Sequence, residues 1–122
     1  MNIRFLTGDI VYIHGSIRVI SSCDGYYATY YDEDEILQEV NVNVIEGIPL
    51  TPEILEKNGW KYFGNGLYWS PNEEDAGVGL SSQTGYVWKA YIGRHIIRSN
   101  INSVSDLQHL LFGLGLNSEM EV

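Results

Sequence analysis

The stretch GIPLTPEILEKNGW, residues 47–60, interrupts a strand-rich sequence with the pattern of a short helix. Thr51 is a suitable N-cap, and Pro52 follows at the first helical position, where its missing N–H group leaves no hydrogen bond unmade. An Asn-Gly pair that ends at Gly59 then supplies a C-terminal stop signal. The stretch therefore predicts a helix over residues 52–58 and divides the chain at this point.

Residues 1–48, which precede this helix, have the pattern of a β-meander. The β-branched runs at 10–13 and 17–20 flank a glycine, which indicates a hairpin because glycine accepts the positive φ angles of a tight turn. An Asp-Gly turn leads into a third run at 26–31, and alternating valine and asparagine over 40–44 is typical of a half-buried strand. About four or five short strands predict an N-terminal SH3-like barrel-type unit or a strongly twisted sheet.

Residues 49–122 are expected to contain the middle helix, two β-hairpins and a C-terminal helix. Glycines mark hairpin turns at 64–66 and near Gly93, and the segment 70–85 between them is predicted to be a mobile connection. A capping serine precedes the last helix, 104–114, where leucines at three- and four-residue spacing make one apolar stripe. The stripe consists of Leu107, Leu110, Leu111 and Leu114.

These patterns predict a single α+β domain, residues 1–122, with a mostly antiparallel β-sheet. Within it, residues 1–48 form the β-meander subdomain and residues 49–122 form the helix-hairpins-helix subdomain.

Sixteen acidic residues against seven basic ones give a formal net charge of −9. Such a field repels duplex nucleic acid and anionic membranes, so neither is expected as a partner. The apolar runs are shorter than a membrane span or a secretory signal needs, which predicts a cytoplasmic protein. The acidic runs at 31–35 and 72–75 are interpreted as solvated loops, because the glycine and distal glutamate of a calcium loop are missing.

The sequence contains no constellation of residues for catalysis or metal binding. Its histidines lie in different predicted elements, and its single cysteine excludes a multi-cysteine zinc site. His109 lies on the flank of the leucine stripe and has no second histidine at helical spacing. We therefore expect a flanking or surface histidine, and a protein that is not an enzyme and holds no cofactor or metal.

The C-terminal sheet combines aromatic and basic residues in an otherwise acidic chain. Aromatic faces stack on nucleobases while Lys and Arg pair with phosphate, so this combination predicts a site for a nucleotide-type ligand. The expected ligand-binding residues are Tyr68, Trp69, Trp88, Lys89, Tyr91, Arg94 and Arg98. The alternative is that the aromatic residues fill a sheet-helix core and that the bases balance nearby acids.

Two motifs relate the chain to a known group of proteins. The first, PLT-x-E-x-L-x-K-x-G-(W/F), matches at Pro49, Leu50, Thr51, Glu53, Leu55, Lys57, Gly59 and Trp60. The second, close to VHxLQxL, matches at Val104, Leu107, Gln108 and Leu110. By these motifs the chain resembles short uncharacterised proteins of Bacteroidales bacteria and their phages, which combine a barrel-like start with a terminal helix. Ser105 stands where their pattern has histidine, so the resemblance assigns no histidine to a site there.

The resemblance implies an origin in a phage or another mobile element. Small phage proteins that interfere with host defence act by stoichiometric binding, so we expect a non-enzymatic accessory protein that binds and sequesters a nucleotide-type defence signal. The alternative is an acidic protein-interaction module that blocks a host protein. We also expect a homo-oligomer, most simply a dimer, because a small domain with a terminal leucine helix gains buried core by association.

Overall fold

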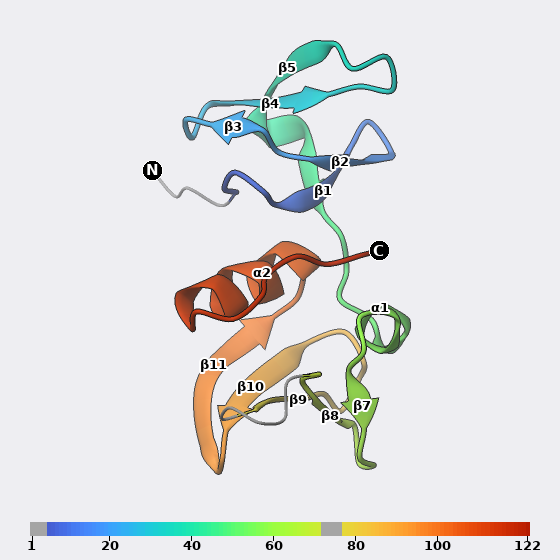
Figure 1. Ribbon diagram of the computed structural model, residues 1–122, viewed down its shortest axis with the longest axis vertical. Helices are drawn as coiled ribbons and strands as arrows, with labels where there is room; N and C mark the ends of the chain where they lie inside the picture. The colour runs from blue at the N-terminus through green and yellow to red at the C-terminus, as the bar shows by residue number, and fades with distance from the viewer. Residues whose placement is uncertain (1–4, 72–76) are drawn as a thin grey trace.

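The structure is a computed structural model that describes residues 5–71 and 77–122. The chain forms two stacked units, an N-terminal one made of strands and a C-terminal one made of two helices and a sheet (Figure 1). The paired strands in the described ranges are antiparallel throughout, which confirms the predicted α+β class. No helix within these ranges has both the length and the apolar character to cross a membrane.

The described strands of the N-terminal unit form two three-stranded sheets. The first has the order β2-β1-β6, with β1 (Ile10–Ile13), β2 (Ser16–Val19) and β6 (Ile45–Gly47). The second has the order β3-β4-β5, with β3 (Ser22–Cys23), β4 (Tyr27–Tyr31) and β5 (Leu37–Asn41). The predicted meander is therefore divided between two sheets.

The first hairpin turns at His14 and Gly15, whose φ angles are 51° and 78°. Positive φ at both central residues is the requirement of a type I′ turn, which glycine meets without a steric penalty. β2 therefore begins at Ser16, which pairs with Ile13. The predicted hairpin is confirmed, with its second strand shifted by one residue.

The prediction of one strand over residues 40–44 is wrong. After β5 the chain turns into the short 3-10 helix η1 (Val42–Val44). The side-chain oxygen of Asn41 accepts a hydrogen bond from the backbone N–H of Asn43 at 2.9 Å, which stabilises this turn against an extended chain. β6 then begins at Ile45 and pairs with β1.

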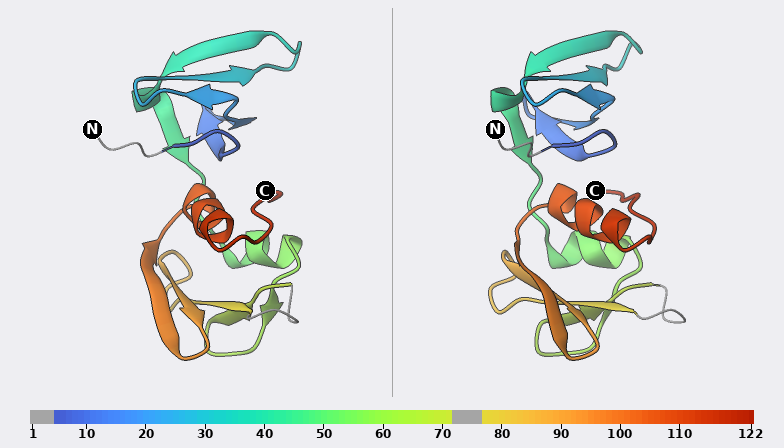
Figure 2. Two further views of the ribbon diagram at one scale, coloured as in Figure 1. Left: turned by 60° about the vertical axis from the view of Figure 1, so that its left-hand side comes forward. Right: turned by 90° about the vertical axis from the view of Figure 1, so that its left-hand side faces the viewer.

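The C-terminal unit begins with α1 and continues into a five-stranded antiparallel sheet of order β11-β10-β9-β8-β7. Its elements are α1 (Pro52–Lys57), β7 (Lys61–Tyr62), β8 (Leu67–Trp69), β9 (Val78–Ser81), β10 (Trp88–Ile92), β11 (His95–Ile101) and α2 (Val104–Gly113). Both predicted hairpins are present as β7-β8 and β10-β11. Figure 2 shows that α1 and α2 lie between the sheet and the N-terminal unit.

The central strand β9 lies inside the segment that was predicted to be a mobile connection. Val78 and Leu80 are fully buried, and β9 pairs with β8 on one side and with β10 on the other. The prediction was wrong for this strand. The segment is rich in glycine and serine, which is typical of a loop, but its two large apolar side chains are buried in the core. The acidic residues 72–75 lie outside the described residues, so their interpretation stays a prediction.

Both helices begin at the predicted caps. Thr51 Oγ1 accepts a hydrogen bond from the N–H of Ile54 at 3.3 Å, and Ser103 Oγ accepts one from the N–H of Asp106 at 3.2 Å. α1 has its C-cap at Asn58. These local signals place each helix within about one residue of its predicted range.

The buried face of α2 differs from the predicted leucine stripe. Its buried residues are Val104, Ser105, Leu107, Gln108 and Leu111. Leu110 is half-buried, and Leu114 is exposed at the C-cap. The face that packs is therefore rotated toward Gln108, because α2 contacts the N-terminal unit as well as the sheet.

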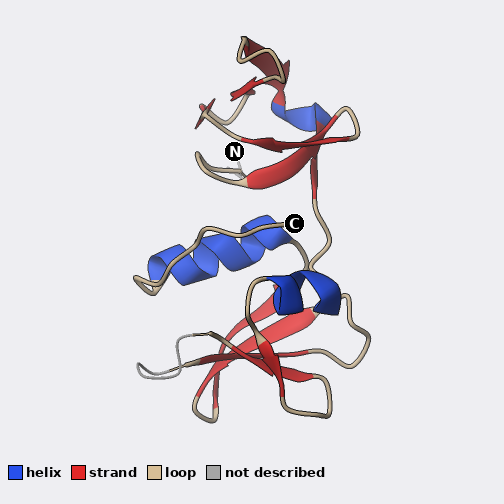
Figure 3. Ribbon diagram, turned by 45° about the vertical axis from the view of Figure 1, so that its right-hand side comes forward, coloured by secondary structure: helices blue, strands red, loops and turns tan. Residues whose placement is uncertain are grey.

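A shared hydrophobic core joins the two units. The larger buried cluster contains Trp88, Leu107 and other residues of the C-terminal unit together with Ile10 of β1. After α2 the chain runs back along the helix and ends beside α1 (Figure 3). Asn58 fixes this tail, because its side chain donates to the carbonyl of Glu121 at 2.7 Å and accepts from the N–H of Glu121 at 2.8 Å.

Candidate functional site

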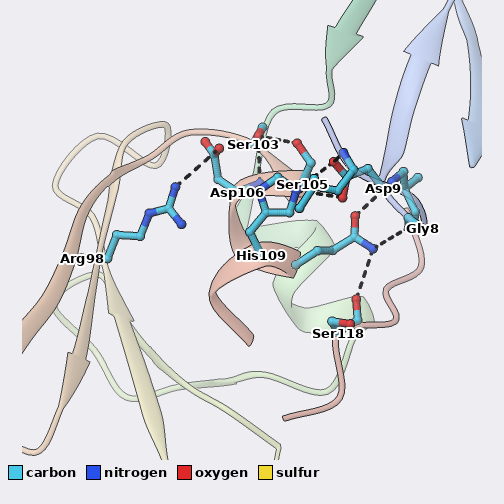
Figure 4. A network of polar contacts seen from close by, with 11 residues as sticks. Gly8, Asp9, Arg98, Ser103, Ser105, Asp106, His109 and Ser118 are labelled. Carbon is cyan, nitrogen blue, oxygen red and sulfur yellow. Dashed lines mark hydrogen bonds and ion pairs between the residues drawn. The ribbon is translucent and has the colours of Figure 1, made fainter. Parts of the chain in front are cut away.

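A buried carboxylate, that of Asp9, joins the N-terminal unit to α2 (Figure 4). Asp9 is 3% exposed, and its two oxygens lie 2.9 and 2.8 Å from Nε2 of His109. Oδ2 also accepts a hydrogen bond from the N–H of Leu6 at 2.8 Å. Burial raises the pKa of Asp9 above its ordinary value, while the hydrogen bonds from Leu6 and His109 act in the opposite direction.

Gln108 forms a second polar link across the same seam. Its Oε1 accepts a hydrogen bond from the N–H of Ile10 at 3.0 Å. Its Nε2 lies 3.2 Å from both the carbonyl oxygen of Gly8 and that of Ser118, and donates to them. One amide therefore connects α2 to the start of β1 and to the C-terminal tail.

Of the two positions predicted for His109, flanking or surface, the structure shows the flanking one. The His109 side chain is only 22% exposed and faces Asp9, a residue 100 positions away in the chain. A helical wheel compares only residues of one helix, so it cannot reveal a partner that lies just before β1 in the chain. The polar Gln108 on a buried face of α2 is the one local sign that the helix packs against polar groups.

These residues surround a pocket of about 380 Å³ between the two units, which we call the seam pocket. Leu6 and Phe112 form its apolar walls, the Asp9–His109 pair forms part of its polar lining, and Gly8 and Ser118 border it. None of these six residues belonged to the predicted site.

A separate polar cluster lies at the start of α2. Asp106 Oδ2 accepts a hydrogen bond from the N–H of Asn102 at 3.1 Å, and its Oδ1 lies 3.9 Å from Nη2 of Arg98. The hydroxyls of Ser103 and Ser105 lie 3.1 Å apart. Of the predicted ligand-binding residues, Arg98 is thus directed toward the helix, where it balances an acid (Figure 4).

Two of the predicted ligand-binding residues are part of the core. Tyr68 and Trp88 are buried, and their rings make an edge-to-face contact with centroids 5.8 Å apart. The indole N–H of Trp88 donates to the carbonyl of Leu50 at 2.9 Å. Burial is also the main reason why the pKa of Tyr68 is raised. For these two aromatic residues the packing interpretation describes the structure.

Trp69, Lys89 and Tyr91 lie on the opposite face of the sheet. Along β10 the buried Trp88 and Ala90 alternate with Lys89 and Tyr91, so the latter pair points away from the helices. Gly79 of β9 pairs with Trp69 on one side and with Tyr91 on the other. Because paired residues of neighbouring strands share a face, Trp69 lies on the same outer face as Tyr91 and Lys89. Arg94 is exposed in the turn between β10 and β11.

Lys89 and Tyr91 line a groove of about 300 Å³ on the outer face. The other polar groups come from the end of β9, from the segment after it and from β11, and we call this site the outer groove. Its polar lining residues are Ser81, Ser82, Gln83, Thr84, Lys89, Tyr91 and Asn100. The sequence identified Lys89 and Tyr91, but the hydroxyl-bearing residues were missed because they lie in the segment interpreted as a connection.

The turn at Gly66 positions one side of the outer groove. The N–H of Ser82 donates to the carbonyl of Gly66 at 3.1 Å, and a Cβ atom on Gly66 would clash with the carbonyl oxygen of Ser82. Gly66 also has a φ of +75°, which a side chain would disfavour. The glycine therefore permits the close approach that holds Ser82 beside the groove.

The acidic run of the N-terminal unit has a structural role. Asp32 Oδ1 accepts hydrogen bonds from the N–H groups of Asp34 at 2.9 Å and of Ile36 at 3.0 Å, which fixes the turn between β4 and β5. These bonds and one from Gln38 lower the pKa of Asp32. Within the described ranges, no group of three or more potential metal ligands comes together.

Known proteins give no further guide to these sites. Comparisons with protein-family models, with curated proteins and with solved structures find no match.

Proposed function

We propose that the protein is a non-enzymatic binding protein whose outer groove takes a nucleotide-type ligand. The observation that carries the proposal is the position of Lys89 and Tyr91 beside a hydroxyl-rich segment on one open face. An ammonium group and several hydroxyl donors suit a phosphate, and an aromatic ring suits a base. Of the described residues that line the groove, none is acidic, although the chain carries a net charge of −9.

Trp69 extends the same face and supplies a second aromatic surface. Trp69 and Tyr91 are separated by Gly79 across two strand spacings, a distance of about 10 Å. A Cβ atom on Gly79 would lie 3.3 Å from the Trp69 ring, so the indole lies over this strand. A base over Trp69 with its phosphate near Lys89 fits this spacing.

The resemblance to phage-associated proteins supports a biological role for such binding. We propose that the ligand is a host defence signal of nucleotide type and that the protein sequesters it without turnover. The described lining of the outer groove supports binding of such a ligand, because its hydroxyl, amide and ammonium groups suit a phosphate.

The test is to titrate a panel of cyclic and linear nucleotides into the purified protein and to follow binding by native mass spectrometry. We expect Lys89→Ala to weaken binding of the preferred nucleotide by about tenfold or more, since a charge-assisted hydrogen bond contributes about 1.5–3 kcal/mol. Tyr91→Ala should weaken it by about fivefold or more, since stacking of a base on an aromatic ring contributes about 1–3 kcal/mol. Lys57→Ala is the charge-matched control, because Lys57 lies on α1, and its side chain donates a hydrogen bond to the tail carbonyl of Val122. Unchanged binding in both groove variants would contradict the proposal.

A specific observation favours the alternative function, an acidic module that blocks a host protein. The turn between β4 and β5 places its acidic residues next to three exposed apolar side chains, Tyr31, Ile36 and Leu37. Such a mixed surface suits a basic partner with an apolar centre. If Asp34→Lys abolishes the biological effect while Lys89→Ala and Tyr91→Ala leave it intact, this alternative replaces the nucleotide proposal.

The N-terminal unit itself is best described, we propose, as an SH3-like barrel-type unit. Along the chain the strands of the sheet β3-β4-β5 lie between β2 and β6 of the sheet β2-β1-β6, with only Ile20 and Ser21 between β2 and β3. η1 leads directly into the closing strand β6. This strand order supports a continuous, strongly bent sheet around a small core.

A further inference from the structure

The seam pocket has apolar walls that the fold leaves open. Phe112 is 78% exposed and Leu6 is 48% exposed, and the two line the same pocket from α2 and from the chain before β1. Large apolar side chains that flank a concave surface are typical of ligand sites. A flat ring between them would remove apolar surface from water without any change in the core.

In the polar part of the pocket, His109 offers a hydrogen-bond acceptor. Nε2 of His109 is directed at the Asp9 carboxylate, so in the neutral imidazole the proton lies on Nε2 and Nδ1 is an acceptor. Among the described residues, Nδ1 has no hydrogen-bond partner, whereas both Asp9 oxygens are engaged. A ligand with an N–H or O–H group supplies the missing donor.

The charges at the seam favour a neutral ligand. The buried carboxylate of Asp9 and the acidic chain repel an anion. A cation gains little, because the Asp9 oxygens already accept hydrogen bonds from Leu6 and His109. Gln108 holds Gly8 and Ser118 in place on either side, so the site is preorganised.

We propose that the seam pocket is a second ligand site, which takes a small neutral aromatic molecule that carries an N–H or O–H donor. The ring lies between Leu6 and Phe112, and the donor binds Nδ1 of His109. The volume of the seam pocket, about 380 Å³, is at the lower end of the range for small-molecule sites, which suits a ligand of one or two fused rings.

The test compares indole with 1-methylindole, which has the same ring system and lacks the N–H donor. Each compound is titrated into the full chain and followed by the backbone amide shifts of Gly8, His109 and Ser118 in NMR spectra. We expect saturable binding of indole at these residues, with 1-methylindole weaker by about two- to tenfold, the range for one net hydrogen bond.

Substitutions separate the ring contact from the donor contact. Phe112→Ala removes an exposed ring without a loss of core packing, and we expect it to weaken both compounds by about fivefold or more. His109→Leu removes the acceptor and should abolish the preference for indole over 1-methylindole. Tyr26→Ala, at a 61% exposed aromatic residue of the N-terminal unit, is the matched control and should change neither affinity.

Three outcomes would overturn the proposal. They are indole shifts that map away from the seam, equal affinities for indole and 1-methylindole in the wild type, and unchanged indole affinity in Phe112→Ala. Phe112→Ala keeps the test valid even if His109→Leu does not fold. Indole binding should also persist in Lys89→Ala, which distinguishes this site from the outer groove.

Discussion

At the scale of single residues, Asp9 gives the stability of the protein an unusual dependence on pH. Its pKa is raised in the folded protein, so the folded state takes up a proton at a higher pH than the unfolded chain, where the ordinary value is near 3.8. The stabilising contribution of Asp9 is therefore greatest below that value and decreases as the pH rises through its folded-state pKa.

Asp9→Asn removes this titration. We expect the difference in the free energy of unfolding, wild type minus variant, to decrease from acid toward neutral pH, as measured by urea unfolding at a series of pH values. Asp24→Asn is a control with the opposite sign, because hydrogen bonds from the N–H groups of Tyr27 and Tyr26 lower the pKa of Asp24. A difference for Asp9→Asn that is constant or increases with pH would contradict the assignment.

Neighbouring residues of β10 show how far composition alone predicts a site. The sequence grouped Trp88 with Lys89 because both suit a nucleotide, but the strand places them on opposite faces. The alternation of faces was predictable, and Lys89 and Tyr91 do share one. Which face is buried was not predictable, because it depends on where α2 and β1 pack.

At the scale of elements, the predictions succeeded where the signal is local. Thr51 and Ser103 cap the helices as expected, and the turns near Gly66 and Gly93 reverse the chain between paired strands. Each of these features depends on a few adjacent residues and on backbone geometry. Such features are determined before any long-range contact forms.

The elements that were missed depend on their partners. β9 is short and poor in large side chains, and it is a strand because β8 and β10 satisfy its backbone on both sides. η1 replaces a predicted strand because Asn41 bonds to its own backbone. In both cases hydrogen bonds determine the local structure, and neither the composition nor the period of the sequence reveals them.

At the scale of the whole molecule, we propose that the protein forms a homodimer. Exposed apolar side chains are numerous for so small a chain, and two of them, Ile96 and Ile97, lie on β11, an edge strand of the described sheet. Association would cover such residues and add buried apolar area. Light scattering at high micromolar concentration should give twice the mass of one chain, and the mass of one chain would contradict the proposal.

The two units should unfold together because Gln108 and the shared core connect them. All three tryptophans follow residue 59, so tryptophan fluorescence reports on the C-terminal unit, whereas far-ultraviolet circular dichroism reports on both. In the wild type we expect the two signals to change in one coincident transition during urea unfolding, as a two-state protein requires.

Gln108→Ala should separate these transitions. The substitution leaves the buried N–H of Ile10 without the partner it has in the wild type, and a buried unpaired group costs about 1–3 kcal/mol. The circular dichroism signal should then begin to change at a lower urea concentration than the fluorescence, because the N-terminal unit loses its anchor while the sheet keeps its core. Gln38→Ala is the matched control, since the Gln38 amide bonds only to Asp32 of the same unit among the described residues. Coincident transitions in Gln108→Ala with an unchanged midpoint would show that apolar contacts alone, such as those of Ile10, couple the two units.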